Sequence, residues 1–173
     1  YDASSWEAAP SPFIFEGNSG DGTPLNPVNT VYFRKPFMVQ HPDSLFQYVV
    51  YLHYDNGAVV YLNGAEVARV NMPYGEITYE TQASDDAETY TYMVLDKSDL
   101  QALVEGENIL GVEMHQRNDD AEDLLFNLKI IDPTTVIDYG DEWYYFDEGT
   151  EPEIQTLGSV GIENSLVTEL KRF

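Results

Sequence analysis

The sequence predicts an all-β protein, a β-sandwich or jelly roll, and two observations support this prediction. Short segments of alternating apolar and polar residues recur along the chain between turn residues, whereas helical spacing is almost absent. Thirteen tyrosines and eight phenylalanines favour strands over helices. The 173 residues suffice for one domain with a sizeable core.

The first elements follow from composition and alternation. Residues 7–30 are rich in proline, glycine, serine and asparagine, which is typical of an irregular but ordered loop region. Residues 30–39 predict a strand whose odd-numbered apolar residues share one face. Pro36 cannot donate a backbone hydrogen bond, so we expect this strand to lie at an edge or to contain a bulge.

Residues 46–70 carry the clearest strand and turn signals and predict a three-stranded meander. The first strand alternates through Tyr54, and the Asp-Asn-Gly at 55–57 is expected to turn the chain into the second. Asn63 and Gly64 are a strong hairpin signal, because both central residues of a type I′ turn need positive φ. The third strand follows directly.

The second half of the chain continues in the same way. Residues 75–83 and 90–96 are strand candidates, and 97–106 predict one helical turn with Ser98 as its N-cap. The last two strands of this region are predicted at 107–116 and 124–131, joined by a polar loop. In the first of them, apolar residues face inward, and the other face carries Glu113 and His115.

Charge is the strongest compositional signal. Thirty-one Asp and Glu residues face eight Lys and Arg, for a formal net charge of −23. Such a surface repels nucleic acid and anionic lipid, and no stretch approaches the roughly 18–20 apolar residues that span a bilayer. We therefore expect neither nucleic-acid binding nor membrane insertion. The charge suits calcium, although solubility explains it equally well.

Catalytic signals are weak. The chain has no cysteine, which excludes disulfides, zinc–thiolate sites and cysteine nucleophiles. It has three histidines and none of the common nucleophile, phosphate-binding, dinucleotide-binding or zinc-protease motifs. Paired carboxylates for glycoside hydrolysis have no specificity as a signal among so many acids. We therefore predict that the protein is not an enzyme.

Five segments carry a resemblance to a known kind of module. In chain order, YDASSW, VYFRKPF, DNGAVVYLNGAEVARVNMP, GENILGVEMHQ and DLLFNLKI resemble a bacterial galactose-binding-like (carbohydrate-binding-module-like) β-sandwich over roughly residues 1–131. The resemblance implies a galactose-binding-like jelly-roll β-sandwich and an extracellular or cell-surface location. Such modules are commonly appended to secreted hydrolases, phosphoesterases and surface proteins, and the fold hosts many functions.

One departure from the resemblance concerns chain order. These modules usually begin with a strand like YGSxWxYxDxG, which precedes the element matching YDASSW. Here YDASSW occupies residues 1–6, and the matching YGDEWYYFDEG occupies 139–149. The resemblance thus implies a sandwich core at 1–135, a displaced strand at 136–150 and a tail or linker at 151–173.

The displaced strand has several explanations. It could complete its own sheet by circular permutation, open the next repeat of a tandem array, or complete the sheet of a neighbouring subunit by donor-strand exchange. It could also be an unrelated strand that only mimics the pattern. The residues that would mediate an assembly are Val136, Ile137, Tyr139, Trp143 and Tyr145.

Calcium is the candidate cofactor, because sandwiches of this type often carry a structural calcium. The loop at 117–123 supplies the oxygen-bearing side chains Asn118, Asp119, Asp120 and Asp123. Asp55 begins a turn that resembles the acidic turn of calcium-dependent sugar-binding adhesin domains, although Asn56 stands where a second acid would be expected. The alternatives are a solvated acidic loop and a turn whose side chains bond their own backbone.

Sugar binding needs aromatic platforms beside planar hydrogen-bonding side chains. The polar candidates are Arg69, Asn71, His115 and Gln116. Trp6 is a candidate platform, but it is better explained as a structural plug. The many tyrosines could instead coat an assembly interface.

These observations predict a non-catalytic extracellular module for carbohydrate binding or adhesion, with the ligand at a loop edge or on the outer sheet face near His115. The alternative is a structural subunit of an extracellular fibre or surface array that assembles head to tail through its C-terminal segment. The predicted partners are accordingly a glycan or other copies of the same chain.

Overall fold

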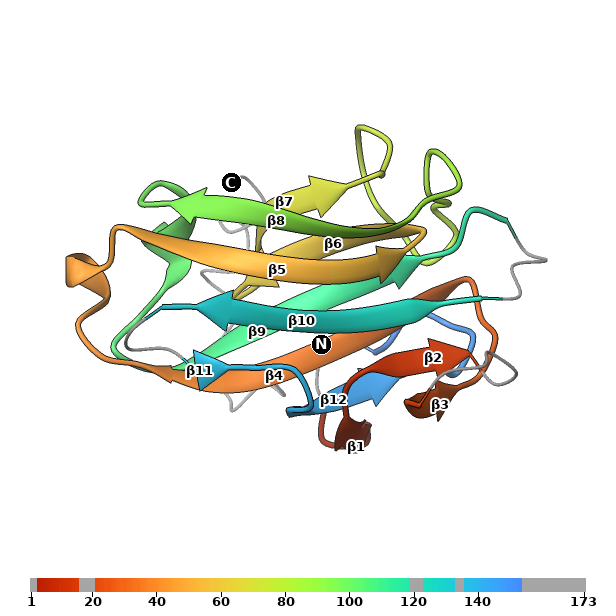
Figure 1. The fold of residues 1–173 in the computed structure, drawn as a ribbon, viewed down its shortest axis with the longest axis horizontal. Helices are drawn as coiled ribbons and strands as arrows, with labels where there is room; N and C mark the ends of the chain where they lie inside the picture. Colours follow the sequence, from red (N-terminus) through yellow and green to blue (C-terminus); the bar gives the residue numbers. More distant parts are fainter. Residues whose placement is uncertain (1–2, 16–20, 119–122, 133–135, 154–173) are drawn as a thin grey trace, which may run out of the picture.

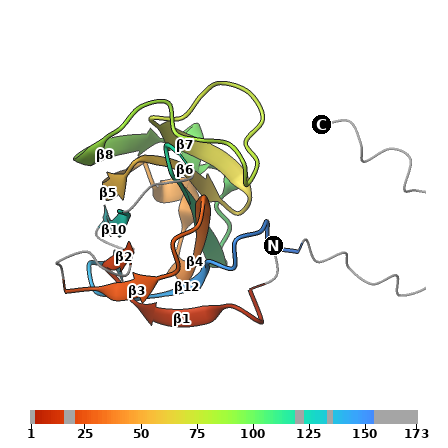
Figure 2. The ribbon, with the colours of Figure 1, turned by 90° about the vertical axis from the view of Figure 1, so that its right-hand side faces the viewer.

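Two β-sheets pack face to face in the computed structural model, which describes residues 3–15, 21–118, 123–132 and 136–153 (Figure 1). The first sheet has the strand order β1-β12-β4-β9-β6-β7, and the second has the order β3-β2-β10-β5-β8, with β11 paired to β10. Figure 2 shows the two layers edge on. The predicted all-β sandwich is confirmed.

The strand bounds are as follows. The first sheet contains β1 (Glu7–Pro10), β4 (Thr30–Val39), β6 (Gly57–Leu62), β7 (Ala65–Val70), β9 (Gly106–His115) and β12 (Glu142–Phe146). The second contains β2 (Phe13–Phe15), β3 (Thr23–Leu25), β5 (Gln47–Asp55), β8 (Glu88–Asp96), β10 (Leu125–Ile131) and β11 (Val136–Ile137). In the part of the chain that the structure describes, no helix is long and apolar enough to cross a membrane.

Strand β4 shows how alternation and proline position combine. Val31 and Phe33 face the core and are buried, as the alternation predicts. Strand β12 pairs with β4 only from Tyr32 to Arg34, whereas β9 pairs along the whole strand. The strand itself is not an edge strand, since β4 lies between β12 and β9 and pairs with β9 without a bulge. Pro36 is tolerated because it lies beyond the end of β12, where β4 has only one neighbouring strand.

The predicted meander at 46–70 is wrong at its first turn. Strand β5 belongs to the second sheet and β6 to the first, so residues 55–57 carry the chain across the sandwich. Alternation could not reveal this crossing, because Tyr54 and Ala58 face the core in either arrangement. The corner is tightly packed: a Cβ added to Gly57 would lie 2.6 Å from Met72 Sδ.

The predicted hairpin between β6 and β7 is confirmed. Asn63 and Gly64 have φ values of 49° and 84°, as a type I′ turn requires. The Asn63 side chain also fixes the turn, because its Nδ2 donates to Ala102 O at 2.7 Å and its Oδ1 accepts from Ile109 N at 2.8 Å.

Three other expectations change in detail. Residues 75–83 do not form a strand, because their segment crosses the ends of β4 and β9 instead of pairing along them, as with the 2.9 Å bond from Ala83 N to Gln116 O. The loop region at 7–30 contains the short strands β1, β2 and β3. The helical turn after Ser98 is a 3₁₀ helix at Asp99–Ala102.

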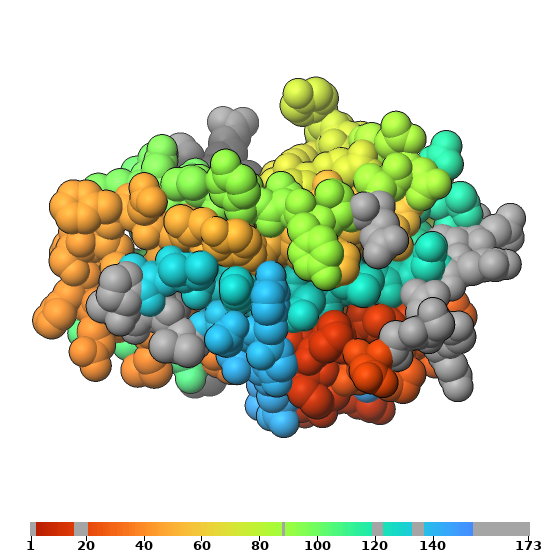
Figure 3. All heavy atoms as spheres, in the orientation of Figure 1, coloured from red at the N-terminus to blue at the C-terminus, as the bar shows by residue number. Residues whose placement is uncertain are grey.

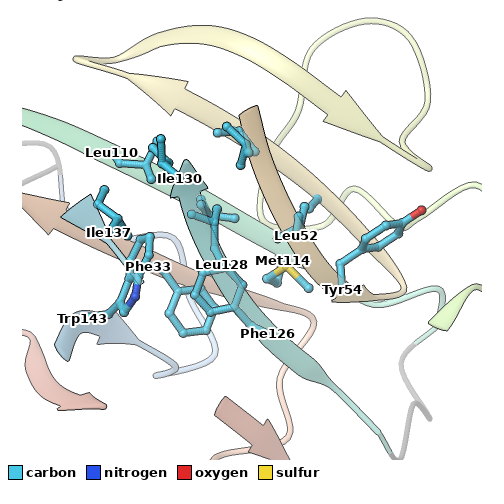
Figure 4. Close-up of a cluster of buried hydrophobic side chains, with 14 of the residues drawn as sticks. Phe33, Leu52, Tyr54, Leu110, Met114, Phe126, Leu128, Ile130, Ile137 and Trp143 are labelled. Carbon is cyan, nitrogen blue, oxygen red and sulfur yellow. The ribbon is translucent and has the colours of Figure 1, made fainter. Parts of the chain in front are cut away.

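The core joins both sheets and includes the C-terminal strand (Figure 4). Trp143 of β12 is fully buried and packs edge to face on Phe126 of β10, with ring centroids 5.1 Å apart. Phe126 in turn stacks on Phe33 at 4.1 Å. In this structure, β12 therefore lies between β1 and β4 of its own chain.

Candidate functional site

A groove of about 640 Å³ lies on the outer face of the first sheet, over β4, β9 and β6. Its lining consists of Trp6, Tyr32, Phe33, Arg34, Tyr61, Asn63, Gly64, Ile77, Ile109, Gly111, Val112 and Glu113. Ligand pockets in proteins typically measure about 300–1,000 Å³, so this groove has the size of a small-molecule site.

The floor of the groove is open because of one glycine. Gly111 of β9 pairs with Arg34 of β4 on one side and with Tyr61 of β6 on the other. All three positions point outward, and Gly111 has no side chain to fill the space between its neighbours. A Cβ added there would lie 3.7 Å from Tyr61 Cβ, which is an ordinary contact.

Aromatic and apolar side chains form the walls. Trp6, which precedes β1, is half-buried and has its ring 5.7 Å from that of Phe146 at the end of β12. Ile77 comes from residues 71–87, the segment between β7 and β8, which we call the covering segment. Trp6 thus both packs on the sheet and exposes part of its indole to the groove.

Glu113 supplies the negative charge of the groove. The Tyr61 hydroxyl donates a hydrogen bond to its Oε2 at 3.1 Å. His115 Nε2 lies 3.4 Å from the same oxygen, which is an ion-pair distance without hydrogen-bond geometry. Among the residues that line the groove, Glu113 is the one carboxylate and Arg34 the one cation.

His115 lies beneath the groove rather than on an exposed face. Its side chain is fully buried, and its Nδ1 lies 2.8 Å from Thr81 O and 2.9 Å from Thr30 Oγ1. A carbonyl can only accept, so Nδ1 carries a proton and donates to Thr81. His115 therefore connects the covering segment to Glu113, and its predicted direct contact with a ligand is not available in this arrangement.

Arg69 and Asn71 are also engaged in internal contacts. The Arg69 guanidinium forms a two-bond pair with Glu66, at 2.6 and 2.7 Å, and donates to Pro73 O. The hydrogen bond with Glu66 raises the pKa of Arg69, and the same bond lowers the pKa of Glu66. Asn71 Nδ2 donates to Asn56 O at 2.8 Å.

Gln116 differs from the other predicted ligand residues. It is 3% exposed, and neither its Nε2 nor its Oε1 has a hydrogen-bond partner in the described part of the chain. Its backbone is fixed on both sides, by bonds to Asn29 O and from Ala83 N at 2.9 Å each. The four predicted residues thus surround the buried end of β9 and do not share one open site.

The predicted calcium ligands are only partly described. Asp119 and Asp120 lie outside the described residues, and Asn118 and Asp123 lie on either side of that gap. Asp55 is 3% exposed and accepts a hydrogen bond from Asn56 Nδ2. Within the described ranges, no three His, Asp or Glu side chains come close enough together to hold a metal ion.

Three of the five predicted assembly residues pack within the chain's own sandwich. Ile137 is 1% exposed, Trp143 is fully buried, and Tyr145 donates from its hydroxyl to Glu7 Oε2 at 2.7 Å. Val136 pairs with Ile131, and its side chain lies outside the described part. Tyr139 is 39% exposed on the outside of the second sheet.

The sequence analysis did not select the residues that make the groove. Tyr32 and Arg34 occupy alternate outward positions on the strand 30–39, and Tyr61 is outward on the next strand of the same sheet. That alternation was a usable signal. However, their convergence on Gly111 depends on which strands are neighbours, and alternation within one strand does not reveal this.

Comparisons with known proteins give limited similarity. No family model and no curated protein matches the chain. Among solved structures, an α-L-rhamnosidase of Streptomyces avermitilis, complexed with L-rhamnose, aligns with 88% of this chain at 22% identity and a TM-score of 0.48. An α-L-rhamnosidase of Dictyoglumus thermophilum aligns with 84% at 16% identity and a TM-score of 0.40. The chain spans only 14% and 16% of those two proteins.

Proposed function

We propose that the protein is a carbohydrate-binding module whose groove over β4, β9 and β6 takes a short neutral glycan. The observation that carries this proposal is the position of Arg34 and Tyr61, which lie on either side of Gly111 and leave an open floor between them. A sugar has apolar C–H faces and a rim of hydroxyls. Aromatic rings match the faces, whereas the guanidinium of Arg34 and the carboxylate of Glu113 match the hydroxyls.

We further propose that the module is not catalytic. Hydrolysis of a glycosidic bond generally requires two carboxylates about 5–9.5 Å apart across the bond. The groove lining offers Glu113 alone. We propose that its role is to bind extracellular or cell-surface polysaccharide.

The test uses a variant that blocks the groove without disturbing the fold. Gly111→Leu places a side chain on the open floor, and its backbone does not need positive φ. We expect the intact chain to bind at least one neutral oligosaccharide on a glycan array, and Gly111→Leu to lose at least tenfold in affinity by calorimetry. Gly111→Ala is the matched control and should retain most of the binding and the melting temperature.

Two results would contradict the proposal. One is the absence of binding to any glycan on the array. The other is unchanged affinity in a folded Gly111→Leu protein, because a ligand seated between Arg34 and Tyr61 cannot tolerate a leucine side chain there.

A further inference from the structure

The outer face of the second sheet carries four exposed tyrosines. Strands β8, β5 and β10 lie side by side on the face that Figure 3 turns toward the viewer, and the segment after β11 lies against β10. In the sheet register, Tyr51 pairs with Tyr92 and with Lys129. We call the following residues, with their exposed fractions, the tyrosine face: Tyr51 (36%), Tyr90 (71%), Tyr92 (67%) and Tyr139 (39%).

The rings of the tyrosine face are held by one another rather than by the core. The Tyr51 and Tyr92 centroids are 6.2 Å apart, and Tyr90 stacks on His53 at 3.4 Å. Lys129 Nζ lies 5.4 Å from the Tyr51 ring and 4.7 Å from the Tyr139 ring, so one cation bridges two rings. Burial and the charges of neighbouring groups raise the pKa of Tyr139.

The choice of aromatic residue is informative. The fully buried rings of the core are mostly phenylalanine, as at Phe13, Phe33 and Phe126. The exposed aromatic positions on this face are all tyrosine, which adds a hydroxyl to each ring. Rings exposed by about two thirds contribute little to the core, and contiguous exposed apolar surface commonly marks a binding site. A ligand that contacts both ring faces and hydroxyls fits this chemistry.

In the described residues, carboxylates border the tyrosine face and are absent from its centre: Asp55 and Asp96 stand at strand ends, and the charge of Asp138 contributes to the raised pKa of Tyr139. The outward positions of the three strands between Asp55 and Asp96 are Val49, Tyr51, His53, Tyr90, Tyr92, Val94, Asn127, Lys129 and Ile131. None is acidic, in a chain whose formal net charge is −23. A polyanion, or a second copy of this chain, would be repelled by the rest of the surface. A neutral polymer would not be repelled.

We propose that the tyrosine face is a second carbohydrate-binding surface, which takes an extended neutral polysaccharide lying across β8, β5 and β10. The proposal rests on the proposed function only for the class of ligand, because its residues are separate from those of the groove. The two surfaces lie on opposite outer faces of the sandwich. A module with both surfaces bridges two polysaccharide chains.

The experiment measures retention of the intact chain on insoluble cellulose, chitin and β-1,3-glucan, and on the acidic polymer polygalacturonate. The face variant is the double substitution Tyr90→Ala and Tyr92→Ala, whose side chains are mostly exposed and so dispensable for folding. Tyr74→Ala is the matched control, because Tyr74 is fully exposed elsewhere. The groove variant Gly111→Leu completes the set, and sedimentation velocity reports the oligomeric state.

We expect the face variant to lose at least tenfold in retention on a neutral polymer and Tyr74→Ala to be unchanged, whereas Gly111→Leu should lose less retention than the face variant. Soluble glycan binding by the groove should persist in the face variant. Unchanged retention of the face variant, or equal retention on polygalacturonate, would overturn the second surface and leave the groove proposal intact. A dimer in the intact chain that the face variant dissociates, without any loss of retention, would show that a second copy occupies the face.

Discussion

Tyr145 couples the stability of the sandwich to alkaline pH. Its pKa lies above the ordinary value of 10, chiefly because of burial and then because its hydroxyl donates to Glu7 and faces two acids. A tyrosine whose folded pKa is raised stabilises the fold below pH 10. That stability is lost as pH rises above 10 toward the folded pKa, since the unfolded chain releases its proton first.

Replacing Tyr145 with phenylalanine should therefore reduce the loss of stability at high pH. We expect Tyr145→Phe to cost about 1 kcal/mol at pH 7, through the lost bond to Glu7, and to lose less in melting temperature than the native chain between pH 9 and 11. Tyr74→Phe, at a fully exposed ring, is the control. If the melting temperatures of all three proteins fell equally between pH 9 and 11, the coupling between Tyr145 ionisation and stability would be refuted.

At the scale of elements, β12 could complete the sheet of its own chain or that of a neighbouring subunit, and the two arrangements can be distinguished by experiment. Trp143 is fully buried against Phe126 of the same chain. Trp143→Ala should cost about 3–5 kcal/mol in denaturant unfolding, because it leaves a cavity between the two sheets. Trp6→Ala is the comparison, since that ring is only half-buried, and it should cost less.

Protein concentration distinguishes a resident strand from a donated one. If β12 lies in its own sheet, the unfolding midpoint of the intact chain should not change over a hundredfold range of concentration. If the strand came from a neighbouring subunit, dilution would lower the midpoint by mass action. A concentration-dependent midpoint would thus restore donor-strand exchange as the better explanation.

The same elements show how far the sequence could be interpreted. Strands with strict alternation, such as β9, and the hairpin at Asn63–Gly64 were predictable because local chemistry dictates them. The crossing at 55–57 was not, since buried faces on both sides look alike in the sequence. The strand predicted at 75–83 was wrong because this segment contacts strand ends and the groove instead of pairing with a neighbouring strand. The groove was missed because Gly111 opens a floor only when Arg34 and Tyr61 are its neighbours in the sheet, and the sequence does not show which strands are neighbours.

At the scale of the whole molecule, charge is the dominant property. Thirty-one acids and eight bases give −23 on 173 residues, so the compact state repels itself. Salt screens exposed charges, with a Debye length that falls from about 30 Å at 0.01 M to about 3 Å at 1 M. The folded chain should therefore be more stable at high ionic strength.

Calcium and screening can be separated by matched solutions. Sodium chloride raised from 10 mM to 500 mM should increase the melting temperature by several degrees if self-repulsion is significant. At equal ionic strength, 1 mM calcium should raise the melting temperature further if the loop at 117–123 holds the ion, and chelator should reverse that part only. Asp123→Asn should remove the calcium-specific increment and keep the salt response. If calcium and magnesium raised the melting temperature equally at every ionic strength, charge screening alone would explain the effect and a specific calcium site would be excluded.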